Sequence, residues 1–201
     1  MAEIRALFWD VGGVLLNNAW DHEERDLAMA RFGIDRAEFE ARHKEIVPAL
    51  EQGRMGLDEY LERSVFYQAR SFTPEEFKQF MFSLSQLKPG VLEIARGLAG
   101  KYFMATINNE SRELNRYRIE TFGLAECFDL FVSSCFVGLC KPDERIYRLA
   151  LDLSQRKAEE CCFIDDRPGN VEAAAKVGMR TVLMKDAEQL RRDLQGLGVE
   201  G

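Results

Sequence analysis

Short apolar runs alternate along this chain with amphipathic stretches of helical period. The apolar runs have the length of buried strands and predict strands at residues 4–9, 102–107, 129–132, 161–164 and 181–184. Helical patterns separate the last four of these strands, at residues 112–122, 143–152 and 171–177, and Pro or Gly stands near their ends. We therefore predict an α/β fold, a Rossmann-like parallel sheet with helices on both faces.

The segment between the first two predicted strands is unusually long and contains no convincing strand pattern. It carries helical patterns at residues 21–32, 36–50 and 57–66, and a further helix opens at Thr73 with a capping-box sequence. Helices inserted into one loop predict a small helical subdomain above the sheet. We expect residues 17–88 to form this cap, and residues 1–16 together with 89–201 to form the core domain.

Composition and charge narrow the range of partners. The chain has 201 residues, of which 46% are hydrophobic, so it can bury one core of ordinary size and carry an insertion. Its net charge of -7 argues against nucleic acid or an anionic membrane, which need a concentrated basic surface, and favours a small soluble substrate. The first residues do not resemble a secretory signal and no apolar stretch is long enough to span a bilayer, so we expect a cytoplasmic protein.

Carboxylates end two of the predicted strands. Asp10 follows the first strand directly and precedes a flexible Gly12-Gly13 loop, whereas Asp165 and Asp166 end the fourth strand. In an open α/β sheet, ligands bind at the carboxyl ends of the strands. An Asp before two glycines is also ordinary turn chemistry, and Asp166 alone could cap a helix. Adjacent acids at a sheet edge repel unless a cation joins them, however, and Mg²⁺ prefers such oxygen ligands.

Two further residues complete a recognisable order along the chain. Thr106 ends the second predicted strand, and Lys141 precedes Pro142 at the start of a helix. The order Asp, Thr, Lys-Pro and Asp-Asp resembles the motifs of the haloacid dehalogenase-like (HAD) hydrolase superfamily, over residues 4–184. The helical insertion resembles a C1-type cap, and the turn at residues 51–60 is similar to the cap turn that faces the active site in relatives.

The resemblance implies a Mg²⁺-dependent phosphatase for a small phosphorylated metabolite, such as a sugar phosphate. Its catalytic residues would be Asp10 as the nucleophile, with Lys141 and Thr106 neutralising charge on the phosphoryl group. The metal ligands would come from Asp10, the backbone carbonyl of Gly12, Asp165 and Asp166. The expected substrate-binding residues are Asn108, Gly13, Arg54 and Trp20. Asn170 would support the metal site through a hydrogen bond.

The chain departs from the family pattern at two positions. Gly12 occupies the place of a second Asp that serves most family phosphatases as general acid and base, and Ile107 stands where relatives often carry a polar residue. Haloacid dehalogenases also lack that Asp, so dehalogenation is one alternative, although the paired acids Asp165 and Asp166 favour a metal site. A catalytically weak binding module of the same fold is the other alternative. The sequence predicts neither the substrate nor the oligomeric state.

Overall fold

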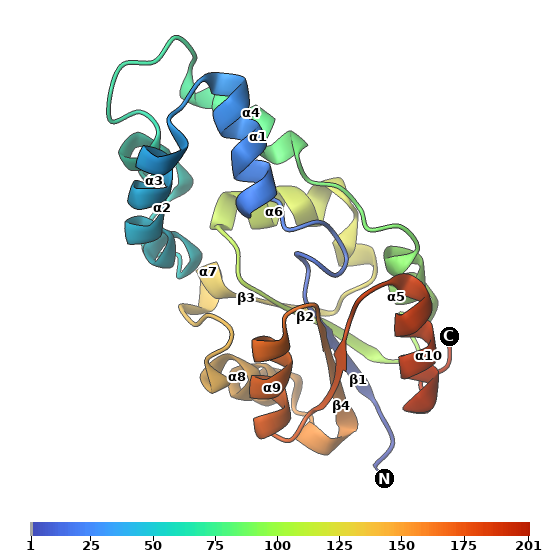
Figure 1. Ribbon diagram of the computed structural model, residues 1–201. Coiled ribbons are helices and arrows are strands. Elements are labelled where there is room, and N and C mark those ends of the chain that lie inside the picture. The colour runs from blue at the N-terminus through green and yellow to red at the C-terminus, as the bar shows by residue number, and fades with distance from the viewer. Residues whose placement is uncertain (1) are drawn as a thin grey trace.

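The computed structural model describes residues 2–201, and within them the chain forms one parallel sheet in the order β3-β2-β1-β4-β5 (Figure 1). The strands are β1 (Ala6–Trp9), β2 (Phe103–Asn108), β3 (Leu130–Ser133), β4 (Cys161–Asp165) and β5 (Arg180–Leu183). Each of them overlaps a predicted strand. The expected Rossmann-like α/β fold is therefore confirmed.

Alternate side chains of the strands build two separate apolar layers. In β1, Leu7 and Trp9 belong to the layer under α5 (Val91–Leu98) and α10 (Ala187–Gly196). Ala6 and Phe8 belong to the opposite layer, under α8 (Glu144–Ser154) and α9 (Pro168–Lys176). All four β1 residues are fully buried, as expected for the central strand of a sheet covered on both faces.

The segment after β1 forms helices only, and these lie above the carboxyl end of the sheet (Figure 1). They are α1 (His22–Phe32), α2 (Arg36–Glu51), α3 (Leu57–Ser64) and α4 (Pro74–Ser83). Their facing sides enclose a hydrophobic cluster of their own, built around buried aromatic rings such as Phe39, Tyr60 and Phe77. Leu114 of α6 (Arg112–Thr121) joins this cluster, so α6 connects the helical cap to the sheet.

The segment that leads from the sheet to the cap and the segment that returns from it lie next to each other. Leu16 and Leu87 form an isolated antiparallel bridge there. The backbone N–H of Asn17 donates to the carbonyl of Gln86 at 2.9 Å, and that of Lys88 donates to the carbonyl of Leu15 at 2.9 Å. The outgoing and returning segments are thus held side by side.

Local signals in the sequence account for some helix ends but not for every helix. The Thr73 side chain accepts from the backbone N–H of Glu76, and the Glu76 carboxylate accepts in return, which confirms the predicted capping box. The sequence patterns did not predict α5, α10 or the four-residue α7 (Ser134–Val137), nor the short turns η1 (Leu124–Glu126) and η2 (Ala158–Glu160). No helix within residues 2–201 is long and apolar enough to cross a membrane.

Candidate active site

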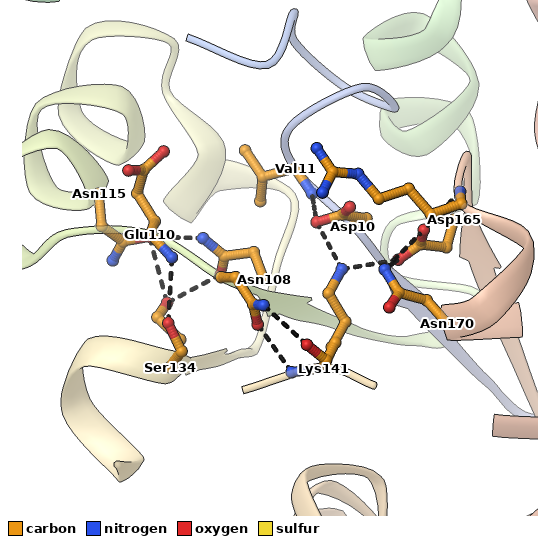
Figure 2. A network of polar contacts seen from close by, with 12 residues as sticks. Asp10, Val11, Asn108, Glu110, Asn115, Ser134, Lys141, Asp165 and Asn170 are labelled. Atoms are coloured by element: carbon orange, nitrogen blue, oxygen red, sulfur yellow. Dashed lines mark hydrogen bonds and ion pairs between the residues drawn. The ribbon is translucent and has the colours of Figure 1, made fainter. Parts of the chain in front are cut away.

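Three charged side chains meet where the central strands end. β1 and β4 are neighbours and pair Trp9 with Ile164, so Asp10 and Asp165 follow side by side. The Lys141 ammonium lies between them, with Nζ 2.8 Å from Asp10 Oδ1 and 2.6 Å from Asp165 Oδ2 (Figure 2). All three side chains are at least nine-tenths buried. The sheet order thus brings together residues that lie more than a hundred positions apart in the sequence.

The loop that carries Lys141 is held by Asn109. The Asn109 amide donates to the Lys141 carbonyl at 3.0 Å and accepts from its backbone N–H at 2.8 Å. This two-bond pairing imitates a backbone ladder and fixes the lysine stem relative to β2. Asn109 was not among the site residues expected from the sequence, although it follows the predicted strand directly.

The paired acids Asp165 and Asp166 have different surroundings. Asp165 accepts from Lys141 and from the Arg167 N–H at 2.8 Å, and both of its oxygens accept from Asn170 Nδ2 at 3.0 Å. Its acceptor capacity is therefore largely used. By contrast, Asp166 Oδ1 is buried and has no hydrogen-bond partner among residues 2–201.

An unsatisfied buried carboxylate oxygen is costly unless a cation binds it. Oxygens of Asp10, Asp165 and Asp166 lie within 4.8 Å of one another, and Lys141 contributes the single positive charge that bonds directly to two of them. The donor set is all oxygen, which suits a hard divalent cation such as Mg²⁺. The arrangement therefore fits a metal ion, with Asp166 as the carboxylate that has an oxygen to spare.

Burial sets the proton affinity of the nucleophile candidate. Desolvation raises the pKa of Asp10 to about 7, against the attraction of Lys141 and with a further upward contribution from Asp165. The pKa of Asp166 is also raised, by burial and by the neighbouring Asp165. Both shifts have the same physical origin, an excess of negative charge in a poorly hydrated place. A cation bound between these carboxylates would lower both pKa values.

The two glycines after Asp10 differ sharply. Gly13 has a positive φ of 84°, and a Cβ built on it would lie 2.2 Å from Asp166 Oδ2, so no larger residue fits without displacing that carboxylate. Gly12 does not have a left-handed backbone, and a Cβ there would meet Asn18 Oδ1 at 3.5 Å and Arg118 Nη1 at 3.6 Å, which are ordinary contacts. Gly13 is therefore required by close packing, whereas Gly12 has space.

Thr106 and Asn108 lie in β2 and do not line the cavity above Asp10. Thr106 pairs with Trp9, so its side chain shares the face that packs under α5 and α10, and its hydroxyl is buried without a partner in the described chain. Asn108 accepts from Ser133 Oγ and donates to Asn115 Oδ1, both at 2.9 Å, in a network beneath the cavity floor. The expectation that Thr106 faces the phosphate is corrected by the length of β2, which continues to Asn108 and leaves the Thr106 hydroxyl inside the core and not at the cavity.

A cavity of about 270 Å³ opens between Asp10 and the cap. Its floor includes Asp10, Gly12 and Lys141. The loop after β2 contributes Asn109, Glu110 and Ser111 to its wall. The cap contributes Trp20, His43 and Glu51. Trp20 therefore lies where the sequence predicted. Arg54 does not line the cavity, because its exposed guanidinium bonds to Gln52 Oε1 at 2.6 Å on the surface.

A hydrogen-bonded relay fixes the aromatic wall of this cavity. Trp20 Nε1 donates to the Tyr60 hydroxyl at 2.9 Å, and that hydroxyl lies 2.7 Å from His43 Nδ1. All three groups are satisfied when Tyr60 donates to Nδ1 of a neutral His43. Burial, followed by repulsion from Arg25, lowers the pKa of His43 to about 4, which keeps the ring neutral at pH 7. The relay makes Trp20 and His43 rigid cavity walls.

This chain belongs to the haloacid dehalogenase-like hydrolases, because the sequence model of that family matches residues 4–178. The chain is thus a member of a hydrolase family. The chain is 29% identical over 177 residues to flavin mononucleotide hydrolase 1 of Arabidopsis thaliana, a match that covers 85% of this chain and 69% of that protein. It is 36% identical to the phosphoserine phosphatase of Thermus thermophilus over 88 residues, covering 43% of this chain and 34% of that protein.

One further relative is much longer than this chain, and two solved structures share its fold. The rat bifunctional epoxide hydrolase 2 is 33% identical over 126 residues, which cover 60% of this chain but 23% of the rat protein. A HAD family enzyme of Bacteroides thetaiotaomicron, solved with magnesium and inorganic phosphate, superposes with a TM-score of 0.76 at 19% identity, over 91% of this chain and 95% of that one. An L-2-haloacid dehalogenase superposes with a TM-score of 0.67 at 19% identity, over 92% and 86% of the two chains. At such identities the two structures establish the fold alone.

Proposed function

We propose that this hydrolase is a Mg²⁺-dependent phosphatase that acts on small phosphorylated metabolites through an aspartyl-phosphate on Asp10. The observation that carries the proposal is the acidic cluster around Lys141, in which one buried oxygen of Asp166 has no partner among residues 2–201. Such a cluster suits a divalent cation and, beside it, a phosphoryl group. Phosphatases among the relatives and the magnesium and phosphate bound to a structural neighbour support it.

The residues of the cluster have distinct roles in this proposal. Asp10, Asp166 and the carbonyl of Gly12 would hold Mg²⁺, which supplies charge neutralisation for the phosphoryl oxygens when bound. Asp165 holds Lys141 in place through the 2.6 Å ion pair. Lys141 lowers the pKa of Asp10 against the effect of burial and attracts the dianionic phosphate. A carboxylate oxygen of Asp10 then forms a bond to phosphorus as the ester bond breaks, and water later hydrolyses the aspartyl-phosphate.

The dimensions of the cavity limit the substrate. Its volume of about 270 Å³ is close to the lower end of the range of ligand pockets, about 300–1,000 Å³. Its wall combines the indole of Trp20 with the carboxylate of Glu51, whose pKa burial raises. Hydroxyl groups can donate to such a carboxylate while an apolar face packs on the indole. This combination favours a phosphate ester of a small polyhydroxy compound, with Trp20 and Glu51 as substrate contacts in place of Arg54.

The proposal is tested with the purified protein and an aryl phosphate as substrate. Hydrolysis should require Mg²⁺ and stop in excess EDTA, and Asp10→Asn should be inactive while unfolding like the wild type. A 2-haloacid assayed for halide release tests the dehalogenase alternative in the same preparation. Metal-independent halide release by the wild type, or undiminished phosphate release by Asp10→Asn, would overturn the proposal. A protein that binds Mg²⁺ but hydrolyses neither substrate would identify a binding module.

A further inference from the structure

A buried arginine lies beside the open position at Gly12. Arg118 extends from α6, has a side chain only 2% exposed, and lines the cavity above Asp10. Its Nη1 is 3.6 Å from the position that a Cβ on Gly12 would occupy. A guanidinium therefore stands next to the place from which a side chain at residue 12 would reach the substrate. The expected motifs included no residue from α6.

The guanidinium of Arg118 is anchored on two sides but keeps free donors. Nη1 donates to Glu110 Oε2 at 3.2 Å, and Nη2 donates to the carbonyl of Asn17. A guanidinium carries five N–H groups, so three remain without a partner among residues 2–201. One of them, on Nε, is fully buried. An unsatisfied buried donor on a charged group is costly, and Arg118 lines the cavity, where a ligand can supply an acceptor.

Arg118 interacts electrostatically with several carboxylates, including that of the proposed nucleophile Asp10. Burial lowers its pKa, and the carboxylates of Glu110, Asp10 and Glu24 oppose that shift. Glu110 is itself buried, and burial raises its pKa to about 7 against the attraction of Arg118. The Glu110 carboxylate also accepts from the Ser111 N–H at 2.9 Å, which fixes it at the end of the loop after β2. Glu110 thus partly neutralises the charge of the guanidinium at the cavity wall.

From this geometry we infer that Arg118 is a catalytic residue that contacts the bridging ester oxygen of the substrate, in place of an acid at position 12. The inference rests on the phosphatase function proposed above. As the bond from Asp10 to phosphorus forms and the ester bond breaks, the electron pair of that bond stays on the leaving oxygen. Arg118 stabilises this negative charge by hydrogen bonds and does not donate its proton, because a guanidinium remains charged at neutral pH. The leaving oxygen takes its proton from water after departure.

The consequence is a preference within the substrate class. A fixed cation helps a leaving oxygen that already tolerates negative charge, such as an anomeric or phenolic oxygen, whereas a simple alkoxide also needs a proton. Sugar phosphates linked through the anomeric oxygen therefore suit this site better than primary alkyl phosphates. The selectivity resides in Arg118 together with the absence of a side chain at Gly12.

The experiment compares Arg118→Met with Arg116→Met, a matched change of an exposed arginine on the same helix. We measure kcat/KM with Mg²⁺ over phosphate esters of graded leaving-group pKa, after confirming that each variant unfolds cooperatively. Arg118→Met should lose about a hundredfold on the most basic leaving groups, as when one oxyanion donor is removed, and much less on the most acidic. The kcat/KM of Arg118→Lys, which keeps a point charge, should lie between the values of Arg118→Met and Arg116→Met on the most basic leaving groups. An equal loss on every ester, or no difference from Arg116→Met, would reject the inference.

A second variant keeps the inference testable if Arg118 variants do not fold. Glu110→Gln removes the charge that partly neutralises Arg118 while keeping the shape of the side chain. Inorganic phosphate, titrated by calorimetry in the presence of Mg²⁺, should bind this variant severalfold more tightly than wild type. Unchanged or weaker phosphate binding with intact folding would indicate that Arg118 serves only as the structural partner of Glu110. Activity that fails in the wild type itself, or that survives Asp10→Asn, would instead reject the phosphatase function.

Discussion

Replacing Gly13 with alanine would place a methyl group 2.2 Å from Asp166 Oδ2 and 2.5 Å from its Cγ. It would also force a residue with a Cβ to keep a φ of 84°. The left-handed backbone costs about 1–2 kcal/mol for such a residue, and overpacking adds about 1–3 kcal/mol. We therefore expect the free energy of unfolding to fall by about 2–5 kcal/mol. The Asp166 carboxylate can relieve the clash only by moving, so Mg²⁺ affinity should fall as well.

The neighbouring glycine supplies the control for this prediction. In Gly12→Ala the new methyl group meets its nearest atom, Asn18 Oδ1, at 3.5 Å, and the backbone is not left-handed. This variant should unfold within about 0.5 kcal/mol of wild type. Denaturant unfolding followed by fluorescence, and calorimetric titration with Mg²⁺, measure the two quantities in both variants. Equal free energies of unfolding and equal Mg²⁺ affinities in Gly13→Ala and Gly12→Ala would contradict the tight packing of Gly13 against Asp166.

Three other predictions concern Gly12, Thr106 and His43. In Gly12→Asp the new carboxylate would pair with Arg118 and be held ionised, so hydrolysis of primary alkyl phosphates should not rise at neutral pH; a clear gain in kcat/KM would contradict this. Thr106→Val removes a buried hydroxyl that has no partner within residues 2–201, so the free energy of unfolding should stay equal or rise by about 1 kcal/mol, and kcat should be unchanged. A large loss of kcat would instead indicate that Thr106 acts in the active site. The folded pKa of His43 is depressed to about 4, so its contribution to stability is fully present above about pH 6.5 and is lost as the pH falls towards 4. Between pH 7 and pH 5, the free energy of unfolding should therefore fall by about 1–2 kcal/mol more in wild type than in His43→Gln. An equal fall in the two proteins would refute the lowered pKa of His43.

The sequence could predict the sheet from general rules, whereas the pairing of Asp10 with Asp165 in one site was implied by the resemblance to the HAD family. Apolar runs of strand length indicate buried parallel strands, and residues that follow such strands share one edge of the sheet. Most helices with caps or clear stop signals were also predicted, although α10, which Asp186 caps, was not. By contrast, α7 spans only four residues, Ser134–Val137, too few for a helical period to appear, and α5 starts after Gly90 without any side-chain cap.

Residues whose role depends on register or on distant packing could not be assigned from sequence. The exact end of a strand decides whether a side chain lies at the carboxyl edge of the sheet, and β2 ends at Asn108, two residues beyond Thr106, which therefore lies in the core. In α6, Arg118 carries no local mark of burial, because charged residues are ordinary on an amphipathic helix. Only its long-range contacts with Asn17 and Glu110 place it at the cavity. Arg54 shows the reverse case, since a turn that resembled a substrate-facing loop directs this side chain to the surface.

The paired crossing segments at Leu15–Asn17 and Gln86–Lys88 have the geometry of a hairpin base. Their antiparallel bridge between Leu16 and Leu87 places the two ends of the insertion next to each other, at the spacing that a short turn would close. Because its two ends are adjacent, an insertion of any length leaves the order of the strands in the sheet unchanged. A helical segment of another size would therefore fit between these two ends without moving Asp10, Lys141 or Asp165, whose positions depend on the strands.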